Sequence, residues 1–171
     1  ASDQDALWRG LAAGDLQVVA TDHCPFAVAD KARGRGDFSK IPNGAPGIET
    51  RLMLLWDGGV RAGKIDENRF VDLVSTGPAR AFGLWPRKGT IAVGSDADLV
   101  VWDPERVTRL SAQTLHMRVD YSPYEGRLVH GGPVAVVSRG ELVVERGEWK
   151  GRAGRGEFLK RGHGAAARVG A

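Results

Sequence analysis

Several features that define common classes of protein are scarce in this sequence. Among 171 residues there is a single cysteine, Cys24, so no disulfide can form within the chain. No stretch approaches the roughly 18 uninterrupted apolar residues of a membrane-spanning helix. The surplus of positive charge is small, with 24 Lys and Arg against 21 Asp and Glu, and much of it lies in residues 150–171. These scarcities argue against a disulfide scaffold, a membrane protein and a nucleic-acid-binding protein, and favour a cytoplasmic location.

Two further absences concern the start of the chain. It begins without an initiator Met and without the charged-then-apolar pattern of a signal peptide, so we expect the sequence to start within a longer protein. Glycine, in contrast, is abundant: 24 residues are Gly, roughly twice the usual share. So many turn-forming residues argue against a bundle of long helices.

The first half of the chain alternates between helical and extended patterns. Apolar residues at helical spacing predict helices over 3–13, 48–62 and 66–75 and a short one over 78–82, while "LQVVAT" at 16–21 reads as a buried strand. Residues 22–47 have no periodicity and are rich in Gly, Pro and charge, and loops of that length are commonly functional. The sequence therefore predicts the end of an α/β barrel.

The second half is strand-like. Short β-branched runs predict strands at 98–103 and 127–130 and a hairpin over 133–149 that turns at "SRGE". A small antiparallel sheet is the expected second unit. After about residue 159 the chain is Gly, Ala and basic residues, which we expect to be loosely ordered unless they dock on a neighbour.

Asp22, His23 and Cys24 stand together where the predicted strand 16–21 stops. Parallel α/β folds place their active sites at such strand ends, so Asp22 is a candidate for chemistry; the alternative is that it caps a turn. Adjacent residues point in opposite directions, which favours a positioning or packing role for His23 over metal ligation. Cys24 could be a nucleophile, although a small buried thiol is the more common case.

Four segments together carry a resemblance to a known family. The segments "TDHCPF", "IPNGAPGIETR", "GPARAFGLWPRKGTIAVGSDADLVVWDP" and "SPYEGRLVHGGPVAVVSRGELVVERGEWKGRAGRGEFLKR" resemble the C-terminal portion of dihydropyrimidinase and D-hydantoinase, members of the cyclic amidohydrolase superfamily. The first two segments point to these enzymes in particular, and the third is shared by many amidohydrolases that have a small β-domain. The likeness runs from about residue 3 to residue 161.

The resemblance implies an α/β fold: the last units of a (β/α)8 TIM-type barrel over residues 1–88, a β-sandwich portion over 89–159, and a basic Gly/Ala-rich tail over 160–171. It also implies two divalent metal ions, usually zinc, bridged by a hydroxide and a carboxylated lysine. Asp22 matches the carboxylate that binds one metal and handles the proton, and is therefore the predicted catalytic and metal-binding residue. Asn43 matches the residue whose main chain holds the substrate.

The implied function is metal-dependent hydrolysis of a cyclic amide, a dihydropyrimidine or a 5-substituted hydantoin, to an N-carbamoyl amino acid by a homotetramer or dimer. The alternative is a non-catalytic dihydropyrimidinase-like scaffold protein. The family's other metal ligands lie upstream of the matched region and have no counterpart here, and His116, His130 and His163 are scattered singly. We therefore expect this chain to be inactive on its own.

Overall fold

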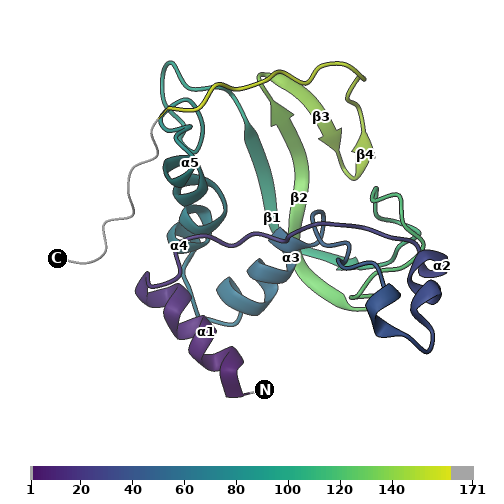
Figure 1. Cartoon of the computed structure of the whole chain (residues 1–171). Helices are drawn as coiled ribbons and strands as arrows, with labels where there is room; N and C mark the ends of the chain where they lie inside the picture. Colours follow the sequence, from purple (N-terminus) through teal and green to yellow (C-terminus); the bar gives the residue numbers. More distant parts are fainter. Residues whose placement is uncertain (1, 163–171) are drawn as a thin grey trace.

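The computed structural model describes residues 2–162, which form a group of helices beside a four-stranded sheet (Figure 1). The chain enters through helix α1, crosses the molecule in an irregular segment, returns through the central helices and then builds the sheet. The helical elements are α1 (Ser2–Ala13), α2 (Val28–Lys31), η1 (Ala32–Gly34), η2 (Phe38–Lys40), α3 (Arg51–Leu55), η3 (Trp56–Val60), α4 (Glu67–Val71), η4 (Asp72–Thr76) and α5 (Gly77–Ala81).

Two long helices form the centre of the helical part. Helix α3 continues into the wide turn η3, and α4, η4 and α5 run on as one helix over residues 67–81. The sequence predicted a break near residue 76, and that prediction was wrong. The wide π-type turn of η4 lies directly before Pro78 and accommodates a residue that cannot donate a backbone hydrogen bond.

The sheet is an antiparallel meander in the order β1-β2-β3-β4. Its strands are β1 (Leu99–Arg109), β2 (Leu128–Ser138), β3 (Glu141–Glu145) and β4 (Glu148–Trp149). The runs predicted at 127–130 and 133–138 belong to one strand, because β2 continues through Gly131 and Gly132. These strands are the only sheet within residues 2–162, so a second layer of the expected sandwich is not among the described residues.

Both hairpin turns of the sheet have two residues. Arg139 and Gly140 have φ of 49° and 78°, and Arg146 and Gly147 have φ of 51° and 89°. Positive φ at both central positions is the requirement of the type I′ turn, whose twist matches that of paired strands. The predicted hairpin at "SRGE" is confirmed, and the second turn follows the same Arg-Gly pattern one strand later.

Residues 16–21 do not form a strand, contrary to the sequence-based prediction. Val19 donates its N–H to the carbonyl of Leu73 at 3.1 Å, and the only ladder contact nearby is an isolated parallel bridge between His23 and Ala45. A strand is defined by hydrogen bonds to a neighbouring strand on at least one of its edges. Within the described part of the chain, no strand runs beside 16–21, so the extended segment has nothing to pair with.

An aromatic cluster joins the helices to the sheet. Trp56 lies 5.3 Å from both Phe70 and Trp102, measured between ring centroids, and Phe70 and Trp102 are 5.8 Å apart. Leu73, on the same long helix as Phe70, is fully buried in the adjoining core. Large aromatic contacts of this kind contribute more than their area alone, so the cluster fixes how the sheet sits against the helices.

The approach of β2 to Trp56 requires a glycine. A Cβ on Gly131 would lie 2.5 Å from Trp56 Nε1, and the residue has φ of +83°. We therefore expect Gly131→Ala to lower the free energy of unfolding by about 2 kcal/mol more than Gly140→Ala does, as overpacking typically costs. Gly140 is the matched control because its φ is +78° and open space surrounds it. Urea unfolding measures both variants, and equal losses would contradict the steric argument.

The segment after β4 is tied back to the fold (Figure 1). Arg139 pairs with Glu157 at 2.9 Å, the side chain of Arg155 donates to the Ser138 carbonyl at 2.5 Å, and Gly162 N–H donates to the Gly83 carbonyl at 2.9 Å. The basic side chains of Arg139 and Arg155 therefore make internal contacts. The rest of the predicted tail, 163–171, lies outside the described residues.

Candidate functional site

Asp22 has a backbone conformation that is uncommon for a residue other than glycine. Its φ is 47°, in the left-handed region, and its side chain is exposed. Within residues 2–162, neither a hydrogen bond nor an ion pair uses its carboxylate, so nothing described supports the alternative of a turn cap. Non-Gly residues in strained conformations cluster at functional sites, and Asp is among the few that tolerate this one.

His23 turns its ring toward the loop that contains Asn43. Its Nδ1 accepts hydrogen bonds from the backbone N–H groups of Gly47 at 3.1 Å and Ile48 at 3.3 Å. A ring nitrogen that accepts two N–H groups carries no proton and offers no lone pair to a metal. The structure therefore gives His23 the positioning role that the sequence favoured.

Cys24 is exposed, and the expectation of a small buried thiol was wrong. Cys24 follows the end of the apolar run and lies in a surface loop, so no hydrophobic core surrounds it. Its backbone has the structural role instead, because its N–H donates to the Ala45 carbonyl at 3.3 Å. Three consecutive residues thus have different roles: Asp22 has no side-chain partner within residues 2–162, while His23 and Cys24 bind residues 45–48.

Asn43 lies on this loop between two residues whose carbonyls accept hydrogen bonds, while its own polar groups have no partner within residues 2–162. Lys31 Nζ donates to the carbonyls of Pro42 at 2.9 Å and Gly44 at 2.7 Å. Asn43 itself is exposed, and no hydrogen bond among residues 2–162 uses its side chain or main chain. Gly44 packs on Cys24 so closely that a Cβ there would lie 2.6 Å from Cys24 Cβ.

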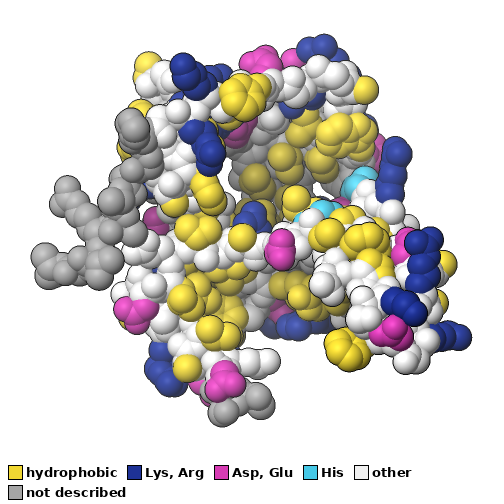
Figure 2. Space-filling model, in the orientation of Figure 1, with side chains coloured by type: hydrophobic (Ala, Val, Ile, Leu, Met, Phe, Trp, Pro, Cys, Tyr) yellow, Lys and Arg dark blue, Asp and Glu magenta, His cyan; other side chains and the backbone are white. Residues whose placement is uncertain are grey.

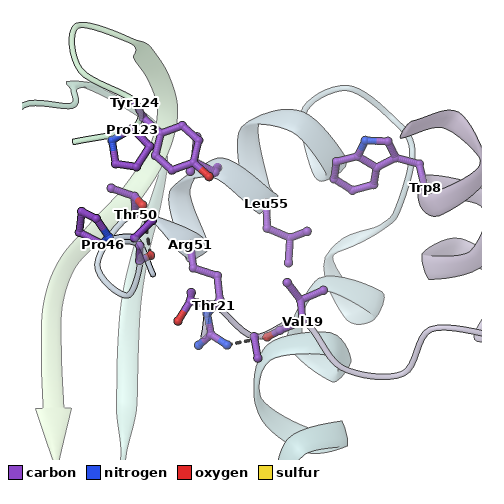
Figure 3. Close-up of a pocket in the computed structure, with 13 residues that line it drawn as sticks. Trp8, Val19, Thr21, Pro46, Thr50, Arg51, Leu55, Pro123 and Tyr124 are labelled. Carbon is purple, nitrogen blue, oxygen red and sulfur yellow. Dashed lines mark hydrogen bonds between the residues drawn. The ribbon is translucent and has the colours of Figure 1, made fainter. Parts of the chain in front are cut away.

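A hollow of about 410 Å³ lies between the 16–21 segment, helix α3 and the 123–124 turn (Figure 3). Arg51 projects into it and donates from Nη1 to the Val19 carbonyl at 2.6 Å, while its Nε is buried without a partner among the described residues. Burial lowers the pKa of the Arg51 guanidinium from its ordinary value. The wall is mainly apolar and is formed by Trp8, Val19, Ala20, Thr21, Ala45, Pro46, Gly47, Thr50, Arg51, Leu54, Leu55, Pro123 and Tyr124.

Comparison with known proteins identifies the family. The profile of the amidohydrolase family matches residues 1–143. This chain belongs to the amidohydrolase family. It is 54% identical to the D-hydantoinase of Streptomyces coelicolor over 159 residues, and 49% identical to a D-phenylhydantoinase of Escherichia coli over 160 residues. The crystal structure of dihydropyrimidinase from Brevibacillus agri superposes with a TM-score of 0.93 at 52% identity.

These matches confirm the predicted resemblance and the predicted fold class. They also show how much of each relative this amidohydrolase covers: 92% of the chain aligns with 34% of the Streptomyces protein, and 95% aligns with 36% of the Brevibacillus structure. The chain thus spans about a third of the length of the relatives it matches. None of the helices in residues 2–162 has the length and apolar character needed to cross a membrane.

The described residues alone do not provide enough ligands for a metal centre. The amidohydrolase family generally uses a binuclear metal centre. Within residues 2–162 of this member, no three His, Cys, Asp or Glu side chains converge on one point. A structural or catalytic zinc ion takes at least three protein ligands, so these residues do not fit a zinc pair by themselves, and Asp22 could supply only one ligand of a site completed from elsewhere.

Sequence reasoning missed the residues that support the site. Lys31 and Arg51 bind main-chain carbonyls at a distance in sequence, and Glu49 accepts hydrogen bonds from the His116 and Met117 backbone N–H groups at 2.6 and 3.2 Å. His116 Nδ1 also lies 2.7 Å from Glu49. No spacing rule indicates such partners. The one available signal was the length of the irregular segment 22–47, which needs anchors to hold a shape.

The contact between Gly44 and Cys24 yields a test of the loop. Gly44→Ala would introduce a Cβ against Cys24 at a φ of +121°, so we expect residues 42–45 to detach and trypsin to cleave after Lys40 severalfold faster. Gly36→Ala, in the same loop at φ of +82° but with open space around it, is the control. Equal cleavage rates for the two variants, followed by mass spectrometry, would show that the close approach does not hold the loop.

Proposed function

We propose that this chain forms the C-terminal third of a cyclic amidohydrolase, here called the parent enzyme, which opens a dihydropyrimidine or a 5-substituted hydantoin to an N-carbamoyl amino acid. The observation that carries the proposal is Asp22, an exposed carboxylate without a partner in residues 2–162, held at φ of 47° beside the loop that bears Asn43. The relatives named D-hydantoinase and dihydropyrimidinase support the same reaction.

Asp22 supplies the proton transfers in this reaction. Water adds to a ring amide carbonyl as the Asp22 carboxylate accepts its proton, and the proton then passes to the ring nitrogen as the carbon–nitrogen bond breaks. The ring opens to a single product, an N-carbamoyl amino acid, whose new carboxylic acid then loses its proton to water. An exposed carboxylate without competing hydrogen bonds is available for both transfers.

Asn43 is the proposed substrate-binding residue. Its main-chain N–H and C=O are both free among the described residues, and a ring amide presents the complementary C=O and N–H. Such a contact depends on the course of the loop and not on the identity of the side chain. His23 and Cys24 hold that course through residues 45–48.

We further propose that Asp22 is this chain's one ligand to a pair of divalent metal ions, with zinc as the expected metal. The remaining ligands would come from the part of the parent enzyme outside this chain, because residues 2–162 bring no group of three candidate ligands together. The homotetramer or dimer stays a prediction from the resemblance, and the cytoplasmic location stays a prediction from the composition.

The proposal is tested by assaying the purified parent enzyme with dihydrouracil, hydantoin and a 5-substituted hydantoin, with chromatographic detection of the N-carbamoyl product. Ring opening of at least one substrate is the expected result. A folded, metal-loaded parent that opens none of them would overturn the proposal and favour the non-catalytic scaffold alternative. Retention of Asp22 in an open, strained position argues against that alternative.

A further inference from the structure

The clearest unassigned contact near the site is the one that Lys31 makes across the 22–47 loop. Lys31 is the last residue of the short helix α2, and its ammonium reaches over to the segment eleven to thirteen residues away. There it donates to two carbonyls, those of Pro42 at 2.9 Å and Gly44 at 2.7 Å. These two residues flank Asn43 on both sides.

The contact is selective, because it uses the neighbours of Asn43 and leaves Asn43 itself alone. No hydrogen bond within residues 2–162 uses the Asn43 N–H, C=O or side-chain amide. Exposed backbone groups without a protein partner bind water or a ligand. A cation that fixes both flanking carbonyls therefore sets the direction of the central peptide groups without occupying them.

The chemistry at this position suits lysine. Its ammonium is a compact charge with three donors, so one atom can serve two carbonyls at once. A hydrogen bond from a charged donor is stronger than one between neutral groups. Lys31 Nζ also lies 5.8 Å from the centre of the Phe26 ring, which helps to hold the side chain across the loop.

Other charges near the loop do not share this task. Lys40 pairs with Asp37 at 3.2 Å within one turn, and its side chain is 69% exposed. Arg33 pairs with Asp30 at 3.0 Å and is 76% exposed. Neither cation reaches the backbone of residues 42–44, so Lys31 is the one side chain among those described that binds both carbonyls.

We propose that Lys31 is a positioning residue: it clamps Pro42 and Gly44 so that the free main-chain groups of Asn43 face the substrate. This inference rests on the proposed function, because it assigns Lys31 a part in the same ring-opening site. Lys31 touches neither substrate nor reacting atoms. It acts through the backbone of Asn43.

The first arm of the test is kinetic and uses the parent enzyme. Lys31→Met keeps the length of the side chain and removes the charge and all donors. The main chain of Asn43 is proposed to bind the substrate equally in the ground state and the transition state, and loss of such binding changes KM. We therefore expect KM to rise roughly tenfold in Lys31→Met, while kcat changes less than about threefold. Lys31→Arg restores donors and is expected to recover most of the loss. Lys40→Met removes one charge from the same loop and is expected to behave like the wild type.

The second arm does not depend on activity. Asn43–Gly44 is an Asn-Gly dipeptide, which deamidates when the Gly44 nitrogen attacks the Asn43 side-chain carbonyl and ammonia leaves. The resulting succinimide is opened by water to aspartate or isoaspartate, and the first step needs a backbone that is free to rotate. The Lys31 clamp should slow this reaction. We therefore expect deamidation at position 43, followed by peptide mass spectrometry under native conditions, to be severalfold faster in Lys31→Met than in the wild type, Lys31→Arg or Lys40→Met.

The two arms separate the possible failures. Unchanged deamidation in Lys31→Met would show that no clamp exists. Faster deamidation with unchanged KM, or a fall in kcat alone, would show that the clamp does not position substrate. If the wild-type parent opens no cyclic amide, the proposed function fails while deamidation still decides whether the clamp is real. Circular dichroism confirms that each variant is folded.

Discussion

Asp22→Asn in the parent enzyme is expected to abolish ring opening of dihydrouracil and hydantoin, with kcat lower by about 10² to 10⁴, the usual contribution of a general acid–base residue. The amide cannot accept a proton at neutral pH, and it is also a weaker ligand for a metal ion. Asn tolerates the left-handed backbone that Asp22 adopts at φ of 47°, so the substitution removes the charge without straining the chain.

The control for this variant is Asp15→Asn, which removes an equally exposed carboxylate just before the same segment. We expect it to leave kcat and the melting temperature unchanged. Steady-state kinetics and thermal unfolding of all three proteins make the comparison. Near-normal turnover by a folded Asp22→Asn enzyme would remove the assignment of Asp22 and, with it, the chemistry proposed for this chain.

The sequence correctly predicted those helices and turns that depend on the properties of nearby residues alone. The helix at α1 follows from Leu7, Trp8 and Leu11 at helical spacing, and the hairpin after β2 follows from the β-branched runs on either side of "SRGE". Residues 16–21 show the limit of this reasoning. Their composition favours a strand, but a strand also needs partners, and none lies beside them in the described part of the chain.

The residues of the candidate site also fall into those that the sequence predicted and those that it did not. Asp22 was predictable because it follows an apolar run directly, and because the surrounding residues carry a family resemblance. The support of the site was not predictable, because His23, Cys24 and Lys31 all act on backbone groups eleven or more residues away. A backbone group carries no residue-type signal, so the sequence does not show which side chain will bind it.

The crowding of a carboxylate, an imidazole and a thiol at residues 22–24 has a physical explanation in this geometry. The three side chains do not form a catalytic or metal-binding group of their own. His23 and Cys24 hold residues 45–48 through hydrogen bonds, and Asp22 precedes them without a hydrogen-bond partner in residues 2–162. We propose that this arrangement presents Asp22 together with Asn43, although twenty-one residues separate them in sequence.

The surface of the chain bears on how it behaves alone. Large apolar side chains are exposed on the sheet, and Figure 2 shows hydrophobic groups uncovered on the face that it displays. Exposed examples on the strands are Val100, Val101, Val107, Leu128, Leu142 and Trp149. Exposed apolar side chains that gather into a contiguous patch mark an interface or an aggregation hazard. In the proposed parent enzyme, the part outside this chain would be available to cover this surface, since the chain spans only about a third of the length of its relatives.

The 171-residue chain expressed alone is therefore expected neither to hydrolyse cyclic amides nor to hold a stoichiometric metal pair. A metal pair needs several converging ligands to offset the cost of dehydrating the ions. Within residues 2–162, no three His, Cys, Asp or Glu side chains lie close enough together to hold a metal ion. The direct measurement is zinc content by atomic spectroscopy after equilibration and desalting, with an assay of dihydrouracil ring opening and the parent enzyme as the positive control. Two tightly bound zinc ions per chain, or measurable turnover, would show that the ligands and the reaction lie within this third after all.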